Sequence, residues 1–425
     1  MKALLSYLRK RATANGCEVV FPWFPEANPN TDALRLIRLT RLEPAGSKWI
    51  NYPLAFVLWI MLSTWAAIRV WLDGSAITAK HFGVGRIRQL LQLLSLAWGR
   101  NVSPIEYYEF QYFKDDIRQR AEYYLPAVRQ ARTSAMMNED KDAGRLNHKF
   151  EAFKNLTAAG IRNPAVLEVF YKDGTREFSS DIRELNQYIG RDFFVKPVNS
   201  YGGDGVARWL HDPVGKQYSD GERVVEETEL WNVLTEEAKS KSAKYTDDTS
   251  RMLQELVANH PVLDALSRES LNTVRVVSLM FPHGDFELMY ATLKMALDDS
   301  IEDTKHCVAS DVDLQSGEVA AAGSADPGED GYSHHPTTGA RIAGVILPHW
   351  DDAIELIKRA HELYNNLPIL GWDIAITPEG PSIIEANCGP KIGSVQAKSL
   401  SPLSQSRYAD LFWAWQAQKT ENSET

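Results

Sequence analysis

The chain has 425 residues, 44% of them hydrophobic, which is enough for roughly two or three compact units with sizeable cores. Its net charge of −10 and its lack of any RNA- or DNA-binding signature argue against a nucleic-acid partner. The three cysteines, Cys17, Cys307 and Cys388, are odd in number and far apart, which argues against a disulfide framework and favours a reducing, cytoplasmic compartment. The apolar run at residues 3–5 is too short for a secretory signal.

The first 100 residues are basic, whereas the rest of the chain is acidic. They hold 13 Lys and Arg against 5 Asp and Glu, a net +8, which leaves −18 for the remainder. Residues 53–72 form a tryptophan-rich run whose only charge is Arg69 and whose length nearly matches a bilayer span. Three interpretations stay open: a buried helix of an N-terminal bundle, a peripheral contact with the cytoplasmic face of an anionic membrane, or a true span.

Helical patterns dominate residues 53–145, after a loop rich in Pro and Asn at 22–30. The segment 103–113 predicts a helix with Ser103 as its N-cap and Pro104 at its first position. We therefore expect residues 1–145 to form a basic, mainly helical N-terminal region.

Mixed helix and strand patterns follow. We expect a helix at about 147–159, two strands within 166–178 around an Asp173-Gly174 turn, and a helix at 181–189. The polar insert 215–230 predicts a surface loop with a short strand. Residues 270–390 predict an antiparallel sheet with one helix at about 350–365, and residues 416–425 predict a polar, frayed tail.

A strand and a glycine-rich loop stand at residues 193–206. The apolar run 193–195 ends at Lys196-Pro197, because Pro197 cannot donate a ladder hydrogen bond. Glycines in the following loop let backbone amides turn toward an anion, and Lys196 is placed to reach a phosphate. Taken singly, this pattern is also that of a plain turn. The glycines are Gly202, Gly203 and Gly205.

An acidic hairpin lies at residues 371–390. The first strand alternates Trp372, Ile374 and Ile376 with residues of the opposite face. In the second strand, Ile383, Glu385 and Asn387 are expected to share a face. A three-residue turn would place Asp373 opposite Glu385, and two carboxylates with the Asn387 amide oxygen suit magnesium with a bound phosphate. The alternative is an exposed acidic hairpin.

Together these segments resemble the ATP-grasp superfamily, and most of all its sugar-transfer-associated branch. The resemblance covers roughly residues 145–400 and rests on six segments in order: 146–161, 193–206, 252–261, 270–279, 334–344 and 371–387. It implies an α+β fold in which two α/β lobes, residues 146–260 and 261–415, clamp ATP. The helical region precedes both lobes in the chain.

The resemblance also implies site residues. Asp373, Glu385 and Asn387 would hold Mg²⁺, with Mn²⁺ as an alternative, and Arg275 would act with Lys196 on the transferred phosphate or an acyl phosphate. The residues implied to contact ATP are Lys149, Lys196, Ser200, Gly202, Gly203, Gly205, Gln254, Glu255, Leu256 and Val257. Lys149 as a solvated lysine and Glu255 as a strand-edge charge remain the alternatives.

The activity that the resemblance implies is an ATP-dependent carboxylate–amine ligase. It would join a small-molecule carboxylate to an amine through an acyl phosphate, in cell-surface glycan or secondary-metabolite synthesis. A small-molecule kinase and a non-catalytic, membrane-peripheral ATP-binding module are the alternatives. Residues 301–308 depart from the branch, so His306 and Cys307 have no assigned role, and neither do the loop histidines His334 and His335.

Overall fold

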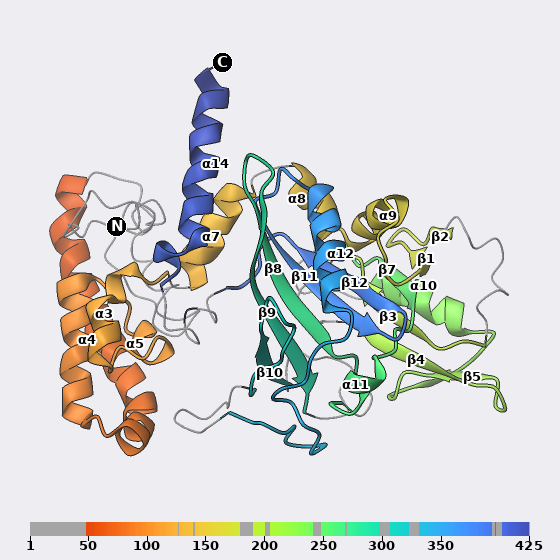
Figure 1. The fold of residues 1–425 in the computed structure, drawn as a ribbon, viewed down its shortest axis with the longest axis horizontal. Helices are drawn as coiled ribbons and strands as arrows, with labels where there is room; N and C mark the ends of the chain where they lie inside the picture. The colour runs from red at the N-terminus through yellow and green to blue at the C-terminus, as the bar shows by residue number, and fades with distance from the viewer. Residues whose placement is uncertain are drawn as a thin grey trace. The chain divides into compact units, whose positions relative to one another are not determined.

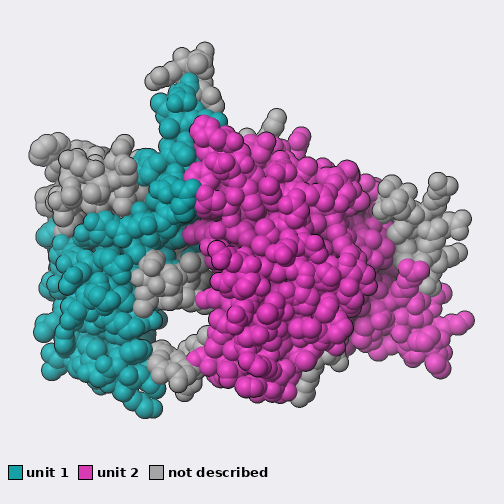
Figure 2. All heavy atoms as spheres, in the orientation of Figure 1, with its two compact units in different colours: residues 1–137, 325–330, 391–425 teal, residues 138–324, 331–390 magenta. Residues whose placement is uncertain are grey.

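The computed structural model describes eleven parts of the chain. They are residues 48–125, 127–138, 141–178, 190–199, 205–240, 248–267, 270–297, 307–322, 331–392, 396 and 402–424. The chain divides into two compact units, one of residues 1–137, 325–330 and 391–425, the other of residues 138–324 and 331–390 (Figure 2). The helix expected at 181–189 lies outside the described residues. The expected lobe boundaries stay a prediction.

The first unit is helical (Figure 1). Its elements are α3 (Lys48–Phe82), α4 (Arg86–Arg100), α5 (Glu106–Glu109), α6 (Asp115–Gln119), η1 (Ala121–Tyr123), α7 (Ala127–Met137), η3 (Leu403–Gln405) and α14 (Arg407–Glu424). Its core packs Leu93 and Leu96 of α4 against the aromatic residues Tyr107, Phe110 and Tyr124.

Two expectations for this unit need correction. The predicted helix 103–113 is only the single turn α5, whose N-cap is Ile105 without a side-chain cap, so Ser103 is not the N-cap. Tyr107, Phe110 and Tyr112 are all buried, and Gln111 has φ 55°, so aromatic burial overrides a continuous helix here. Residues 416–424, expected to fray, continue α14, whose Lys419 Nζ donates to the Met136 carbonyl at 2.7 Å.

The second unit contains a seven-stranded sheet with the order β2-β1-β7-β3-β4-β5-β6. Its strands are β1 (Val166–Phe170), β2 (Arg176–Phe178), β3 (Phe193–Pro197), β4 (Ala207–Asp212), β5 (Gln217–Ser219), β6 (Val224–Glu226) and β7 (Arg251–Glu255). Helix α10 (Leu230–Ser240) packs on one face through Trp231 and Leu234. Helix α9 (Lys149–Ala158) packs on β1 and β7 through Phe150 and Phe153.

A five-stranded antiparallel sheet with the order β10-β9-β8-β11-β12 completes the unit. Its strands are β8 (Thr273–Met280), β9 (Phe286–Ala296), β10 (Cys307–Val312), β11 (Ile369–Thr377) and β12 (Gly380–Asn387), and its helices are α8 (Lys141–Asn147), α11 (Pro261–Asp264) and α12 (Trp350–Glu362). Helix α12 packs on one face of this sheet, where Leu356 and Ile357 meet Val276, Trp372 and Ile374 in the largest core (Figure 1). The opposite face is therefore the one that remains for a site.

Most of the expected elements of this unit are present. The hairpin at 166–178, the strand ending at Pro197 and the helix near 350–365 are confirmed. The insert 215–230, expected to be a surface loop with one short strand, contains two short paired strands, β5 and β6, before α10 begins at Leu230.

A buried histidine fastens α12 to the five-stranded sheet. The ring of His361 shares hydrogen bonds with Ser278 Oγ at 2.7 Å and with the Leu367 carbonyl at 2.8 Å. Trp372 Nε1 donates to the same Ser278 Oγ at 2.8 Å. Burial lowers the pKa of His361 to about 4, so the ring is neutral in the folded protein at neutral pH.

We expect His361 to make this unit sensitive to acid. The unfolded chain takes up the histidine proton near pH 6.5 and the folded protein only near pH 4, so stability falls as the pH drops through that window. The full effect is about 3 kcal/mol at about 1.4 kcal/mol per pKa unit. Urea unfolding at pH 7 and pH 4.5 should show a smaller pH-dependent loss in His361→Gln than in the wild type. The same substitution at exposed His283 is the control, and equal losses in all three proteins would contradict the prediction.

Candidate functional site

One row of side chains crosses the face of the five-stranded sheet that is opposite α12. The strand register pairs Asp311 with Thr292, Thr292 with Arg275, Arg275 with Asp373, and Asp373 with Glu385. Cross-strand partners lie on the same face of a sheet, so five neighbouring strands each contribute one polar residue. Val274 and Ile374, the chain neighbours of this row, point into the core with α12.

A β-bulge sets the position of Glu385. Thr377 pairs with Gly380, so the turn has two residues and not the expected three, and a regular ladder would place Ile384 opposite Asp373. The register shifts between Asp373 and Ile374, which leaves Ile384 as the extra residue and brings Glu385 opposite Asp373. The predicted pairing of Asp373 with Glu385 is therefore confirmed, although for a different reason.

The same bulge corrects a second expectation. Ile383 pairs with Ile374 and is buried in the core with α12, whereas Glu385 pairs with Asp373 on the opposite face. Ile383 therefore does not share a face with Glu385, because the extra residue reverses the alternation along β12. Asn387, paired with Gly371, stays on the face of Glu385.

Asp373 is held by two cations. Its carboxylate accepts hydrogen bonds from Arg275 Nε and from Arg275 Nη2, the latter at 2.6 Å, and Lys294 Nζ lies 3.6 Å from Oδ1. Burial alone would raise the pKa of Asp373, but Arg275 and then Lys294 outweigh it and hold that pKa well below its usual range. Burial likewise opposes the charge on Arg275, yet Asp373 keeps the pKa of the guanidinium above its ordinary value.

Two lysines approach Glu385 from the seven-stranded sheet and from α9. Lys149 is the first residue of α9, its backbone N–H donates to the Val198 carbonyl at 3.1 Å, and its Nζ lies 3.7 Å from Glu385 Oε2. Lys196, on β3, donates through Nζ to the carbonyl of the bulged residue Ile384 at 3.1 Å. Both lysines are buried, which excludes the alternative of a solvated Lys149.

Lys196 is poorly solvated, and its charge is opposed by its surroundings. Its Nζ lies 4.6 Å from the centroid of the Phe153 ring. Burial, and next the positive charge of Lys149, lower the pKa of Lys196 to about 7, against smaller opposing effects of Glu385 and Asp373. An anion bound beside this amine would restore its charge.

Positive charge exceeds negative charge around the central part of the row. Among the residues that the structure describes, the side chains that meet there are those of two carboxylates, Asp373 and Glu385, and of four bases, Lys149, Lys196, Arg275 and Lys294. The next carboxylate along the row, Asp311, is exposed at the outer edge of the sheet. An excess of desolvated cations is unfavourable unless the site binds a strongly negative group.

The residues expected to hold a metal provide only oxygen donors, which suits Mg²⁺. Glu385 is half-buried with one oxygen facing Lys149, and the buried Nδ2 of Asn387 has no hydrogen-bond partner among the described residues, so no bond holds that end of its amide. Asp373 is already engaged by Arg275. In the described part of the chain, no group of three or more His, Cys, Asp or Glu is placed to hold a metal. Glu385 and Asn387 thus fit best, with Asp373 as a third oxygen donor.

The expected adenine hinge lies where β7 ends. Gln254 Nε2 donates to the Pro164 carbonyl at 3.3 Å, and Glu255 Oε1 accepts from the Ala165 N–H at 2.9 Å, so both side chains fasten the segment before β1. Glu255 is the exposed last residue of β7, which agrees with the alternative of a strand-edge charge. Among the described residues, the peptide groups of Leu256 and Val257 make no backbone hydrogen bond, so they are the parts of the hinge open to a base.

The end of the glycine loop is fixed at Gly205. Its carbonyl accepts from Arg251 Nη1 at 2.8 Å, and its φ of +82° is a left-handed conformation that glycine adopts without strain. Ser200, Gly202 and Gly203 lie outside the described residues.

We expect Gly205→Ala to lower the free energy of unfolding by about 1–2 kcal/mol, because an alanine in this conformation is strained. Its Cβ would also lie 3.2 Å from Pro197 Cγ. Gly221→Ala is the matched control, since Gly221 has φ +89° but no atom near the added Cβ. Urea unfolding should show the larger loss for Gly205→Ala, and a larger loss at Gly221 would contradict the role of the contact.

The structure describes three of the four histidine and cysteine residues that had no assigned role. His335 is buried, and its Nδ1 accepts from the Thr338 N–H at 3.2 Å, so it has a structural position in its loop, while His334 is exposed. Cys307 begins β10, and His306 lies outside the described residues. Sequence reasoning missed Lys294, although the period-two alternation of Tyr290, Thr292 and Lys294 with apolar residues in β9 marks one polar face.

The model of the family described as sugar-transfer associated ATP-grasp matches residues 128–406. No curated protein matches the chain.

Solved structures give distant matches. N5-carboxyaminoimidazole ribonucleotide synthetase from Thermotoga maritima is 12% identical, with coverage of 64% of this chain and 49% of that one and a TM-score of 0.33. D-alanine–D-alanine ligase from Bacillus anthracis is 13% identical, with coverage of 66% and 70% and a TM-score of 0.33. The chain spans about half the length of the carboxyaminoimidazole ribonucleotide synthetases that it matches. At such TM-scores these likenesses carry no argument about activity.

Proposed function

The chain belongs to the sugar-transfer associated ATP-grasp family, and from this premise we propose that it is an ATP-dependent carboxylate–amine ligase. One observation carries the proposal: four basic side chains, Lys149, Lys196, Arg275 and Lys294, converge around two carboxylates on one sheet face. This excess of cations suits the triphosphate of ATP, which would compensate their charge.

The two sheets would divide the nucleotide between them. The peptide groups of Leu256 and Val257 would meet the adenine, and Lys149 and Lys196 would bind phosphate oxygens. Glu385, Asn387 and Asp373 would hold magnesium, which when bound neutralises charge on phosphoryl oxygens. Arg275, fixed by Asp373, would orient the group being transferred.

The reaction would proceed in two steps without a covalent enzyme nucleophile. A carboxylate oxygen of the substrate attacks the γ-phosphorus, the bond to the β-phosphate oxygen breaks, and ADP leaves. The amine nitrogen then attacks the acyl carbon and displaces phosphate, and the amine proton is released. Lys149, Lys196 and Asp373 are buried, so an acyl phosphate held beside them would be poorly accessible to bulk water, which would slow its hydrolysis.

The test is ADP release by the full-length protein with magnesium-ATP, against separate pools of amino acids, amines and sugar acids. We expect ADP only when a carboxylate and an amine are both present, together with a product whose mass fits an amide. Lys358→Met is the control for loss of a surface lysine on α12, and Lys149→Met should lose the signal.

The other outcomes distinguish the alternatives. A phosphorylated acceptor without an amide would show a small-molecule kinase. Tight ATP binding with no ADP release in any pool would favour a non-catalytic ATP-binding module. Failure of the intact protein to bind ATP at all would overturn the nucleotide site itself.

A further inference from the structure

The hairpin of α3 and α4 exposes apolar side chains that no described part of the chain covers. On α3, seven large apolar residues are exposed, and apart from Phe56 and Ile77 they share one side: Val57, Met61, Trp65, Ile68 and Leu72, with Met61 64% and Leu72 59% accessible. At 100° per residue they fall within about 80° of one another, so they form one stripe along the helix. Contiguous exposed apolar surface of this kind marks an interaction site.

The second helix of the hairpin has a stripe of its own. Ile87, Leu91 and Trp98 of α4 are exposed at helical spacing, whereas Leu93 and Leu96 on the opposite side are buried in the unit's core. Each helix therefore packs inward through one face and leaves a second apolar face to the surroundings.

The hairpin itself carries mostly positive charge, although Arg88 of α4 pairs with the exposed Asp115 of α6 at 3.3 Å. Residues 48–100 contain six Lys or Arg and a single acid, Asp73, which gives a net charge of +5. Arg69 borders the α3 stripe on one side and lies over Trp65, with 5.6 Å between its Cζ and the ring centroid. Tryptophan and arginine together at the border of an apolar face are typical of side chains at a membrane interface.

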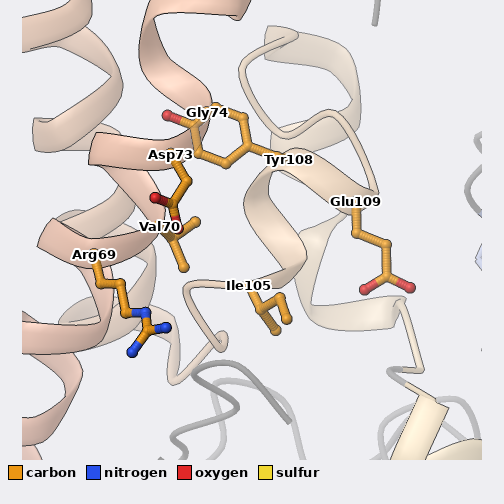
Figure 3. Close-up of a pocket in the computed structure, with 7 residues that line it drawn as sticks. All are labelled: Arg69, Val70, Asp73, Gly74, Ile105, Tyr108 and Glu109. Carbon is orange, nitrogen blue, oxygen red and sulfur yellow. The ribbon is translucent and has the colours of Figure 1, made fainter. Parts of the chain in front are cut away.

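The one acid is turned away from the stripe. Asp73 lines a cavity of about 560 Å³ together with Arg69, Gly74, Tyr108 and Glu109 (Figure 3). By helical angle Asp73 lies beyond Arg69, on the side of α3 that faces α5. Among the described residues of α3, the charged side chain next to the stripe is therefore Arg69, and Asp73 lies about 40° further round the helix.

Polar contacts, buried at Gln89 and exposed at Trp71, tie α3 to α4. The side chain of Gln89, fully buried in α4, donates through Nε2 to the Ser75 carbonyl at 3.1 Å and accepts through Oε1 from Tyr108 OH at 2.8 Å. Trp71 Nε1 donates to the Arg86 carbonyl at 2.8 Å. Moving α3 alone into a bilayer would break these contacts, and this would cost about 1–3 kcal/mol for each buried group left unpaired.

The stripe is also too short and too one-sided for a span. Helix α3 is long and apolar enough over Phe56–Phe82 to cross a membrane, by length and composition only. The exposed stripe, however, runs from Val57 to Leu72, about 22 Å at 1.5 Å per residue, whereas a bilayer core is about 30 Å thick. Trp59, Ala66 and Ala67 on another face are buried in the protein.

We propose that the α3–α4 hairpin is a peripheral membrane anchor that lies in the headgroup layer of an anionic bilayer. Its apolar stripes enter the boundary between headgroups and acyl chains, and the basic residues contact lipid phosphates. The site on the five-stranded sheet is separate from this anchor in sequence and in unit, so the proposal does not depend on the reaction.

The test is flotation of the full-length protein with two kinds of vesicle, at low and at high salt. One kind is neutral phosphatidylcholine alone, and the other contains about one third anionic phosphatidylglycerol. We expect binding to the anionic vesicles that falls with salt. Met61→Glu should lower the partition coefficient between vesicles and water about ten-fold, because it places a charge where the Met61 side chain would enter the bilayer. Val214→Glu, at a residue 94% exposed in the second unit, is the matched control and should bind like the wild type.

Three results would overturn the anchor. Equal binding to neutral vesicles would remove the electrostatic part of the proposal. Protein that resists extraction by high salt and by alkaline carbonate would indicate a span. Absence from all vesicles, together with a dimer in light scattering that Met61→Glu converts to a monomer, would assign the stripe to a second copy of the chain. Circular dichroism and ATP binding of each variant exclude misfolding.

Discussion

Arg275→Met is expected to lower the stability of the second unit by about 3–5 kcal/mol, the usual cost of removing one partner from a buried ion pair. Asp373 lies in the interior of the five-stranded sheet with both carboxylate oxygens bonded to Arg275. The substitution would leave that carboxylate with Lys294 alone, at 3.6 Å. An uncompensated buried charge, and not the loss of packing, would account for most of the effect.

The pH dependence of this loss separates the two causes. In the wild type, Arg275 holds the pKa of Asp373 well below its usual range, so Asp373 contributes stability at neutral pH that is lost only in strong acid. In Arg275→Met that pKa rises, and protonation of Asp373 should shrink the difference from the wild type as the pH falls toward 4. A packing defect would cost the same at every pH.

Hydrogen-exchange mass spectrometry on peptides of β11 measures the loss where it arises. The double variant Arg275→Met/Asp373→Asn should recover at least half of it, because the unpaired charge is gone. Arg145→Met is the matched control, since the Arg145–Asp142 pair is on the surface of the same unit and should cost at most about 1 kcal/mol. Equal losses in the single and double variants would contradict this role of Arg275.

Glu385→Gln is expected to change ATP affinity in opposite directions with and without magnesium. Lys149 Nζ lies 3.7 Å from Glu385 Oε2, so without metal the Glu385 carboxylate would repel phosphates bound to Lys149. Removal of this negative charge should therefore strengthen ATP binding about ten-fold. With saturating magnesium, the variant lacks a metal ligand and should bind ATP about ten-fold more weakly than the wild type.

Calorimetric titration with ATP in chelator and with magnesium-ATP gives both values. Glu379→Gln is the matched control: Glu379 lies on the turn of the same hairpin, is 67% exposed in its side chain, pairs with Arg162 and accepts a hydrogen bond from Thr377 Oγ1. It should leave both affinities unchanged. A Glu385→Gln variant that keeps the magnesium dependence of the wild type would remove Glu385 from the metal site.

The fold follows from the sequence where one periodicity dominates. The ATP-grasp fold class, with a helical region before the sheets, is confirmed by the family match. The structure also contains β3, expected from an apolar run that ends at Pro197, and β11, expected from strict alternation. The segment 103–113 was misassigned because its aromatic residues are buried on all sides, which local pattern reasoning does not anticipate. In residues 416–424, polar composition suggested fraying, yet α14 continues.

For the site, residue types were easier to predict than geometry. The opposition of Asp373 and Glu385 was expected from a three-residue turn, whereas it arises from a two-residue turn and a bulge at Ile384. No local signal marks that bulge, because Ile384 is an ordinary strand residue and nothing in its type shows that it is the extra one. Lys294 was missed for another reason: its polar face was readable in β9, but its proximity to Asp373 depends on the order of strands.

The most direct test of a phosphate site beside Lys196 is the number of protons taken up when ATP binds. The free protein holds the pKa of Lys196 at about 7, and neighbouring phosphates would raise it, so at pH 8 binding should take up close to one proton. Magnesium-ATP is already ionised at that pH. Calorimetry of magnesium-ATP binding in buffers of different ionisation enthalpy counts the protons. Uptake in the wild type and none in Lys196→Met is the expected result, whereas ATP binding without uptake in the wild type would place the phosphates elsewhere.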